Sequence, residues 1–416
     1  MVDPTAPFDR TLVPPGLLSL DLDALVAEYG TPLFVYDEDH LRSRCRVYVE
    51  NFGAGNVVYA SKAFLCAAMA RLVAEEDLSL DVSTGGELHV ALRAGFPSDR
   101  IVFHGNNKSS DEIAQARDSG VGCIVADSND ELDRLENLGY AGEVLVRVTP
   151  GVEAHTHEYV ETGTERSKFG FSVATGAAME AVQRVAGSKT LSFGGLHCHI
   201  GSQVFRLDSY AKAAAVMEKV ASNVEKAIGT PVPSLDVGGG LGARYLPDDP
   251  ELSVAQYAEV LHDALPGRRV VVEPGRSIAA SAAITIYRVG TVKNVPGVTT
   301  YIAVDGGMSD NPRPVLYGAG YEAYLPDRIE QERPLAASVA GKHCEQGDVV
   351  VPDAHLPADV RPGDLLVTPV TGAYGYSMAS NYNKVPRPAV LFVSEGNVCA
   401  VIRRENPDDL TRLDVE

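Results

Sequence analysis

The stretch Val57-Val58-Tyr59-Ala60-Ser61-Lys62-Ala63-Phe64 decides how the rest of the chain is interpreted. Its first four residues form a short apolar run typical of a buried strand, and Lys62 stands where that strand should end. A lysine amine is a weak nucleophile while it is protonated, but a desolvated pocket lowers its pKa and makes it reactive. The simpler interpretation is a surface lysine at the end of a strand. The neighbouring pattern has to decide between the two.

Strand-like runs and helix-like segments alternate after this stretch. The runs lie at 57–60, 80–83, 101–104, 123–126, 144–148, 191–199, 234–237 and 270–273. Apolar residues recur at helical spacing between them, for example in 64–74, 209–228 and 254–265. Eight strands alternating with helices predict a (β/α)8, or TIM, barrel. The alternative is a doubly wound open sheet, which normally has a glycine-rich turn after its first strand, where this chain has Lys62.

The pattern changes at about residue 281. From there to the C-terminus, short apolar runs are separated by Gly and Pro, with no long helical segment between them. This predicts an all-β second domain, barrel-like or sandwich-like, and an early strand at 32–37 is placed to pair with it. The expected division is therefore a barrel at 38–280 and a β domain formed by 1–37 together with 281–416.

Composition narrows the class of protein. The 416 residues are 45% hydrophobic and 22% charged, with a formal net charge of -20, as in a soluble globular protein. The negative charge argues against nucleic acid or an anionic membrane as partner. No signal peptide is visible, and no apolar run reaches the roughly 18 residues of a membrane span. Six scattered cysteines without a CxxC pair predict free thiols in a reducing cytoplasm.

The ends of the predicted strands carry polar side chains and glycines. In such barrels the chemistry gathers at the C-terminal ends of the strands, and phosphate is held after the last two. Lys62 and Asp81 end the first two strands, and His197 and His199 end the sixth. Gly238-Gly239-Gly240 and Glu273-Pro274-Gly275-Arg276 follow the last two. Glycines let backbone N–H groups approach an anion, and Arg276 adds charge, although a glycine run also simply permits a tight turn.

A lysine, a phosphate site and a carboxylate at one barrel mouth indicate pyridoxal 5'-phosphate (PLP) as cofactor. Lys62 would hold the aldehyde of PLP, and Glu273 would pair with the pyridine nitrogen so that the ring can accept electrons. His199 would stack on the ring, unless it is an ordinary core histidine.

Motifs spread over nearly the whole chain resemble those of the fold-type III PLP-dependent decarboxylases, the family of ornithine, diaminopimelate and arginine decarboxylases. The matching segments are VVYASKAFL, SLDVSTGGEL, THEYVETGTERSKFGFS, LHCHIGSQ, LDVGGGLG, VVEPGRSI, DGGMSDNPRPVLYGA, GKHCEQGD and TGAYGYSMASNYN. The resemblance implies a PLP-binding barrel with a β domain that completes the active site and the dimer interface. It also implies a homodimer with shared active sites.

The resemblance also implies roles for individual residues. The catalytic residues would be Lys62, His199 and Cys344, where Cys344 comes from the other subunit and protonates the carbanion. The cofactor would be held by Lys62, Asp81, His199, Ser202, Gly239, Gly240, Glu273, Gly275, Arg276 and Tyr374. The substrate would be bound by Arg276, Arg313, Tyr317, Glu345 and Tyr374.

The charges of the substrate-binding residues separate the candidate substrates. Ornithine and lysine end in a lone ammonium, whereas diaminopimelate ends in both an ammonium and a carboxylate. Arg313 and Tyr317 suit the carboxylate, and Glu345 suits the ammonium. The expected reaction is therefore conversion of meso-2,6-diaminopimelate to L-lysine and CO2, the last step of lysine biosynthesis. The alternative for Arg313 is a structural ion pair.

Other interpretations stay open at this stage. Gln346 stands where the family usually has serine, which leaves room for a related amino acid of specialised metabolism as substrate. The pairs His155/His157 and His197/His199 are also found in metal-dependent barrel hydrolases, although such a site would not explain Lys62. A PLP-binding protein without turnover and an alanine racemase are further alternatives. An inactive homologue would usually lack the lysine or the cysteine, and a racemase would not need the GKHCEQGD segment.

Overall fold

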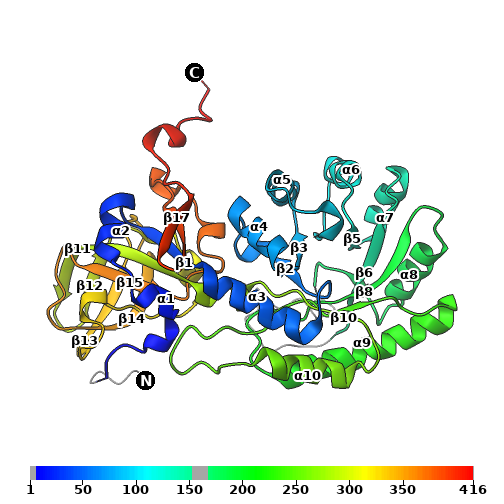
Figure 1. Ribbon diagram of the computed structural model, residues 1–416, viewed down its shortest axis with the longest axis horizontal. Coiled ribbons are helices and arrows are strands. Elements are labelled where there is room, and N and C mark those ends of the chain that lie inside the picture. Colours follow the sequence, from blue (N-terminus) through cyan, green and yellow to red (C-terminus); the bar gives the residue numbers. More distant parts are fainter. Residues whose placement is uncertain (1–5, 152–166, 416) are drawn as a thin grey trace. The chain divides into compact units, whose positions relative to one another are not determined.

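The computed structural model describes residues 6–151 and 167–415. The chain forms two compact units, each followed in Figure 1 by its colours and labels. The barrel unit consists of residues 44–242 and 252–277, and the β unit consists of residues 1–43, 243–251 and 278–416. The short segment 243–251 thus leaves the barrel sequence to join the β unit, which the sequence pattern did not indicate.

The barrel unit is built on eight parallel strands in the order β10-β9-β8-β6-β5-β4-β3-β2. Their bounds are β2 (Val58–Ala60), β3 (Ser79–Val82), β4 (Ile101–Phe103), β5 (Cys123–Ala126), β6 (Glu143–Thr149), β8 (Ser192–His197), β9 (Leu235–Asp236) and β10 (Val270–Val271). The two end strands meet, because Val57 pairs in parallel with Val272 and the N–H of Val58 donates to the carbonyl of Val272 at 2.9 Å. The sheet therefore closes, and the predicted (β/α)8 barrel is confirmed.

The barrel strands are short and buried. Every residue of β2 and β5 is buried, as is all of β6 after Glu143. A parallel strand covered on both faces has no solvent side, so its sequence is a continuous apolar run instead of an alternation. An additional strand β7 (Phe171–Ser172) pairs with β6. It was not predicted, since two residues carry no periodicity.

Helices alternate with the barrel strands along the chain and cover the outside of the sheet (Figure 1). They are α3 (Glu38–Phe52), α4 (Ala67–Glu75), α5 (Gly85–Arg93), α6 (Ser110–Ser119), α7 (Asn129–Asn137), α8 (Ala177–Gly187), α9 (Leu207–Ile228), α10 (Val254–Ala264) and the single turn α11 (Arg276–Ala279). Several begin where a hydroxyl accepts an N–H of the first turn, as Thr84, Ser109 and Ser253 do. Strand ends and helix starts are thus fixed by local chemistry, and this places the connecting loops at the mouth of the barrel.

The β unit contains a mixed sheet with the strand order β14-β13-β12-β11-β1-β16-β17, and β15 also pairs with β11. The bounds are β1 (Leu33–Asp37), β11 (Ala283–Val295), β12 (Thr299–Val304), β13 (Leu335–Ala340), β14 (Val349–Leu356), β15 (Leu365–Pro369), β16 (Ala389–Ser394) and β17 (Asn397–Ile402). The early strand β1 lies in the middle, antiparallel to β11 and parallel to β16, as expected from its position in the sequence.

The β unit is not purely β. It carries short helices, α1 (Pro15–Leu18), α2 (Leu22–Tyr29) and α12 (Arg313–Tyr317). The edge strand β17 is a continuous apolar run from Val398 to Ile402, yet none of its residues is buried.

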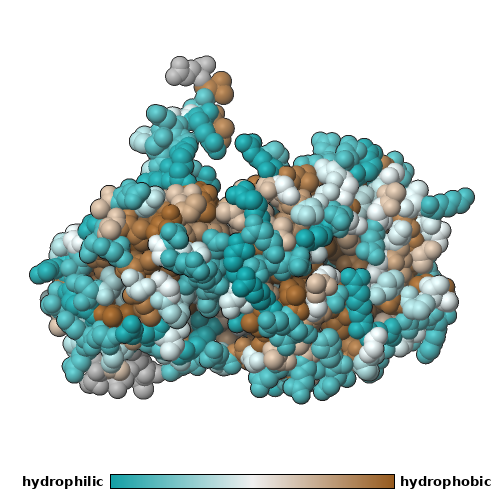
Figure 2. Space-filling model, viewed as in Figure 1, coloured by the Kyte–Doolittle hydropathy of each residue, from teal (hydrophilic) through white to brown (hydrophobic). Residues whose placement is uncertain are grey.

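The visible surface is mainly polar. In Figure 2 hydrophilic side chains predominate on this face, with smaller apolar areas between them, in keeping with the high content of charged residues. None of the helices in the described ranges has the length and apolar character that crossing a membrane requires.

Candidate active site

The C-terminal ends of the barrel strands bring most of the predicted cofactor residues to one side of the barrel unit. Lys62 lies in the turn directly after β2, and Asp81 belongs to β3. His199 follows β8, the three glycines follow β9, and Glu273 follows β10. This is the arrangement that a parallel barrel dictates, because all its strands end at the same mouth.

Lys62 is held by a carboxylate. Its Nζ donates to Oδ2 of Asp81 at 3.0 Å, and the lysine side chain is 48% exposed whereas Asp81 is 1% exposed. Glu87 lies behind this pair and accepts the N–H of Ser83 at 2.6 Å. Burial raises the pKa of Glu87, and the charge of Asp81 raises it further. The amine of Lys62 is therefore partly exposed at the opening of the barrel, and its hydrogen bond to the buried Asp81 fixes its position.

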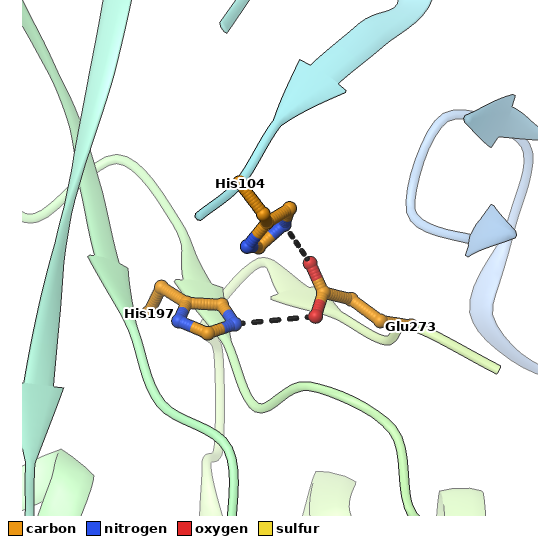
Figure 3. Close-up of side chains that lie close together, drawn as sticks. All are labelled: His104, His197 and Glu273. Carbon is orange, nitrogen blue, oxygen red and sulfur yellow. Dashed lines mark hydrogen bonds and ion pairs between the residues drawn. The ribbon is translucent and has the colours of Figure 1, made fainter. Parts of the chain in front are cut away.

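Glu273 is a buried carboxylate held between two histidines (Figure 3). Its Oε1 lies 2.6 Å from Nε2 of His104, and its Oε2 lies 3.2 Å from Nε2 of His197. Burial by itself would raise the pKa of Glu273, but the two imidazoles lower it well below its usual range. Burial lowers the pKa of His197 to about 4, so its ring is neutral at pH 7 and donates to the carboxylate.

A second buried carboxyl group stands beside Glu273 in the opposite state. Asp236 of β9 is 0% exposed, and its Oδ1 accepts the N–H of Gly238 at 2.8 Å. Burial raises the pKa of Asp236 well above its usual range, and the charge of Glu273 adds to this shift. Two adjacent carboxyl groups thus divide into one that is protonated and one that is ionised. Glu273 is the one that presents a negative charge.

His199 is neutral and fixed in one tautomer. Its Nδ1 accepts the N–H of Gly239 at 3.2 Å, so the proton of a neutral ring is on Nε2. Burial lowers the pKa of His199 well below its ordinary value, and the positive charges of Lys62 and Arg147 lower it further. An uncharged ring whose Nδ1 is hydrogen-bonded to the backbone is suited to packing against another ring.

The glycine loops form a close-fitting cradle. A Cβ on Gly239 would lie 2.1 Å from the carbonyl oxygen of Glu273, and one on Gly240 would lie 2.2 Å from that of Gly201. Gly240 also has φ +104°, which favours glycine. Its N–H has no acceptor among the residues that the structure describes. Glycine is therefore required at both positions, because any side chain would overlap the carbonyl oxygen of a neighbouring loop.

Arg276 begins α11 beside this cradle. Its Nη2 donates to Oγ of Ser202 at 2.9 Å, and its Nε lies 3.3 Å from the same oxygen. A guanidinium, a hydroxyl and a free backbone N–H together are a donor set suited to a phosphate group. The residues present therefore fit PLP: an amine for its aldehyde, a carboxylate for its ring nitrogen and an anion cradle for its phosphate.

Of the predicted substrate residues, Arg276 belongs to the barrel unit and the other four belong to the β unit. Arg313 begins α12 and is buried, its guanidinium lies 4.6 Å from the ring centroid of Tyr245, and its Nη1 donates to the hydroxyl of Tyr321. No carboxylate within the described ranges forms an ion pair with Arg313, so it is not the structural ion pair that was considered as an alternative. Tyr317 ends the same helix and is half-buried. Tyr374 lies in the turn after β15.

Cys344 and Glu345 lie in the turn between β13 and β14. Asp348 closes that turn, since its Oδ2 accepts the N–H of His343 at 2.8 Å and its own N–H donates to the carbonyl of Glu345 at 3.1 Å. All six cysteines are free, and four of them are buried, but Cys344 is exposed. The carboxylate of Glu345 accepts the hydroxyl of Tyr382. The turn thus presents a thiol and a carboxylate side by side to solvent.

The sequence interpretation missed two members of the site. His104 follows β4, and Asp236 precedes the three glycines, yet neither was assigned a role. Their position at strand ends was the available signal, because Lys62, Asp81 and Glu273 were found that way.

The metal alternative rests on few residues. His155 and His157 lie outside the described residues, so this part of the hydrolase interpretation has no structural account. Among the described residues, one group has ligand atoms close enough for a metal ion: His104, His197 and Glu273, within 4.8 Å of one another. In that group each imidazole is directed at a separate oxygen of Glu273 (Figure 3), and the histidines thereby act as partners of the carboxylate.

A closed barrel with a lysine, an arginine beside glycine loops and an ionised carboxylate at its mouth is the arrangement expected of a pyridoxal-dependent enzyme. The family model described as "Pyridoxal-dependent decarboxylase, pyridoxal binding domain" matches residues 38–280, and the chain belongs to this family. It is therefore a carboxy-lyase by family.

Particular relatives narrow the comparison. The chain is 50% identical over 421 residues to diaminopimelate decarboxylase of Mycobacterium tuberculosis (strain ATCC 25618 / H37Rv), with 96% of this chain and 94% of the relative covered. It is 46% identical over 408 residues to diaminopimelate decarboxylase of Bacillus subtilis (strain 168), with 94% and 93% covered. The crystal structure of diaminopimelate decarboxylase from Helicobacter pylori complexed with L-lysine matches with a TM-score of 0.87 at 32% identity, covering 95% of this chain and 99% of that one.

Proposed function

We propose that this protein decarboxylates meso-2,6-diaminopimelate to L-lysine and CO2 with PLP as cofactor, the last step of lysine biosynthesis. The observation that carries the choice of substrate is the buried Arg313, which has no carboxylate partner in the described part of the chain. An arginine that is buried beside two tyrosines and lacks a counter-charge calls for an anionic ligand group. The relatives named above support the same choice.

The barrel unit would hold the cofactor. Lys62 would carry its aldehyde, with Asp81 beside the amine, and Glu273 would pair with its pyridine nitrogen. The phosphate would lie against Gly239, Gly240 and Gly275, with donors from Arg276, Ser202 and Tyr374. When bound, PLP accepts the electron pair that the departing carboxylate leaves behind.

The side chains of the protein would orient the substrate and move its proton. Arg313 and Tyr317 would bind the distal carboxylate, Glu345 would bind the distal ammonium, and Arg276 and Tyr374 would contact the substrate beside the cofactor. The bond between the α carbon and its carboxylate breaks, CO2 leaves, and the α carbon takes a proton from the thiol of Cys344. Water then returns a proton to the thiolate. His199 would cover one face of the ring and exclude water from it.

We also propose a homodimer with shared active sites, in which Cys344 and Glu345 of one subunit serve the Lys62 of the other and the β unit completes the site. The exposed position of both residues in the β13–β14 turn supports this. Mixing the Lys62→Ala and Cys344→Ala variants, each inactive by itself, should restore part of the activity. No recovery after demonstrated subunit exchange would refute the shared site. The six free thiols support a cytoplasmic location.

The substrate is tested by direct comparison. The purified protein is loaded with PLP and incubated separately with meso-diaminopimelate, ornithine, lysine and arginine, and CO2 release is measured. Release from meso-diaminopimelate about tenfold to a hundredfold faster than from the others is expected, since loss of a charge-assisted contact costs about 1.5–3 kcal/mol. Equal or greater release from another amino acid would refute the assignment. Because Gln346 adjoins Glu345, the Gln346→Ser variant measured in parallel shows whether this position alters the preference.

A further inference from the structure

His104 is a buried imidazole to which none of the steps above assigns a role. It follows β4, is 6% exposed and places Nε2 2.6 Å from Oε1 of Glu273. Its ring also packs edge-on against His197, with centroids 5.0 Å apart and planes at 67°. Figure 3 shows the carboxylate of Glu273 between the two rings, one on each oxygen. Because each histidine contacts a different oxygen, the two histidines together restrict the rotation of the Glu273 carboxylate.

The backbone around His104 is fixed on both sides. Its N–H donates to the carbonyl of Val82 at 2.8 Å, which ties it to β3. Next in sequence, Gly105 has φ +115°, and a Cβ there would lie 3.0 Å from the carbonyl oxygen of Ser83. This turn therefore has little room to shift.

A buried lysine, Lys108, is hydrogen-bonded to the same turn. Lys108 is 2% exposed, and its Nζ donates to the carbonyls of Gly105 at 2.7 Å and Val125 at 2.8 Å. It also contacts Oε1 of Glu131 at 2.5 Å. All three N–H donors of the ammonium thus have acceptors, which makes the buried charge tolerable. The consequence is that the loop carrying His104 is tied to β5 and α7 as well as to β3.

The groups that face Glu273 come from five strands. His104 follows β4, His197 ends β8, and Asp236 lies on β9. The charges of Arg147 on β6 and Asp81 on β3 act on Glu273 or on Asp236 from further away. The two imidazoles lie 2.6 and 3.2 Å from separate oxygens of Glu273, and the carboxyl group of Asp236 also contacts this carboxylate. Removing one imidazole would leave one carboxylate oxygen without its partner and free the group to rotate.

We propose that His104 is a positioning residue, which holds the carboxylate of Glu273 in the orientation that meets the pyridine nitrogen of PLP, and that Lys108 holds His104 in place. The inference rests on the proposed function, since it assumes that Glu273 is the partner of that nitrogen. His104 acts through Glu273 and does not itself need to touch the cofactor or the substrate.

The test is a double-mutant cycle on cofactor binding. The dissociation constant of PLP is measured by absorbance titration of the cofactor-free full chain for wild type, His104→Phe, Glu273→Gln and the double variant. His104→Phe should weaken PLP binding about tenfold or more, the factor that loss of a hydrogen bond to a charged group gives. In the Glu273→Gln background the same substitution should change binding less than about twofold, because the two residues act as one unit.

Conservative variants separate positioning from mere packing. His104→Gln places an amide N–H near the position of Nε2 and should bind PLP within about threefold of wild type. The pH at which the visible absorbance of the bound cofactor changes should move in His104→Phe and stay in His104→Gln. His89→Gln, on the exposed side of α5, is the matched control and should change neither. If His104→Phe does not fold, His104→Asn replaces it, because its amide is too short to reach Oε1.

The outcomes distinguish the two proposals. Equal weakening by His104→Phe in both backgrounds, or none in either, overturns the positioning role while leaving the proposed function intact. Wild type that binds no PLP, or PLP binding and absorbance that Glu273→Gln leaves unchanged, overturns the pairing of Glu273 with the cofactor and the role of His104 with it.

Discussion

Substitution of Gly240 by alanine tests the phosphate cradle most directly. The Cβ would lie 2.2 Å from the carbonyl oxygen of Gly201, whereas real Cβ contacts essentially never fall under 3.0 Å, so the two loops must separate by at least the difference of 0.8 Å. The positive φ of +104° adds a backbone penalty of about 1–2 kcal/mol. The overpacking adds about 1–3 kcal/mol. Together these predict a loss of a few kcal/mol, shared between the stability of the loop and its affinity for PLP.

The assay is titration of cofactor-free protein with PLP, followed by visible absorbance. A displacement approaching 1 Å in a binding loop predicts PLP binding weaker by about a hundredfold. Two control glycines separate the causes. Gly187 has ordinary φ and nothing within 4 Å of an added Cβ, and Gly229 has φ +76° and equally open surroundings. Alanine at Gly187 should be neutral, and alanine at Gly229 should lower stability without changing PLP binding. Gly240→Ala that binds PLP within about threefold of wild type would refute the cradle.

Three other predictions concern charge. Lys108→Met should lower the unfolding free energy by about 3–5 kcal/mol in urea denaturation, because it leaves the buried Glu131 carboxylate without its positive partner. Addition of Glu131→Gln should restore much of the loss. A double variant whose loss of stability equals the sum of the two single losses would contradict the ion pair. Arg313→Lys should raise KM for diaminopimelate about tenfold or more at unchanged PLP affinity, because an ammonium cannot form two parallel hydrogen bonds to a carboxylate; an unchanged KM would remove Arg313 from the substrate site. The pKa of His197 is about 4 in the folded chain, against an ordinary value of 6.5, so between these pH values the unfolded chain binds more protons than the folded chain. The unfolding free energy should therefore fall by about 3 kcal/mol as the pH is lowered from 6.5 to 4. Urea midpoints between pH 6.5 and 4.5 should therefore fall less steeply in His197→Gln than in wild type, and parallel slopes would contradict the buried neutral ring.

The barrel was predictable because its strands are enclosed on both faces. Runs such as Val57–Ala60 stay apolar throughout, and their even separation by helical segments leaves few alternative topologies. The two-residue β7 was missed because it is too short to leave a pattern of its own in the sequence and is defined by its pairing with β6.

The residues of the site that directly follow a barrel strand could be predicted from the sequence. Lys62 and Glu273 could be placed at the mouth because each follows an apolar run. The contacts among side chains could not be placed in the same way. That His104 meets Glu273, or that Lys108 donates to Val125, depends on the register between strands far apart in sequence. No local propensity encodes that register, and only the closed sheet determines it.

The central position of β1 in the β unit has a consequence for biosynthesis. Leu33 pairs with Ile286 of β11, 253 positions further along the chain (286 less 33), and with Ala389 of β16, which is synthesised later still. At translation rates of about 5–20 residues per second, this buried strand waits roughly 10–50 s for its first partner to be synthesised. All the barrel strands are synthesised within that interval. The nascent β1 is thus an apolar segment that stays unpaired while a whole barrel is made, which makes it the part of the chain that a cotranslational chaperone would be expected to cover.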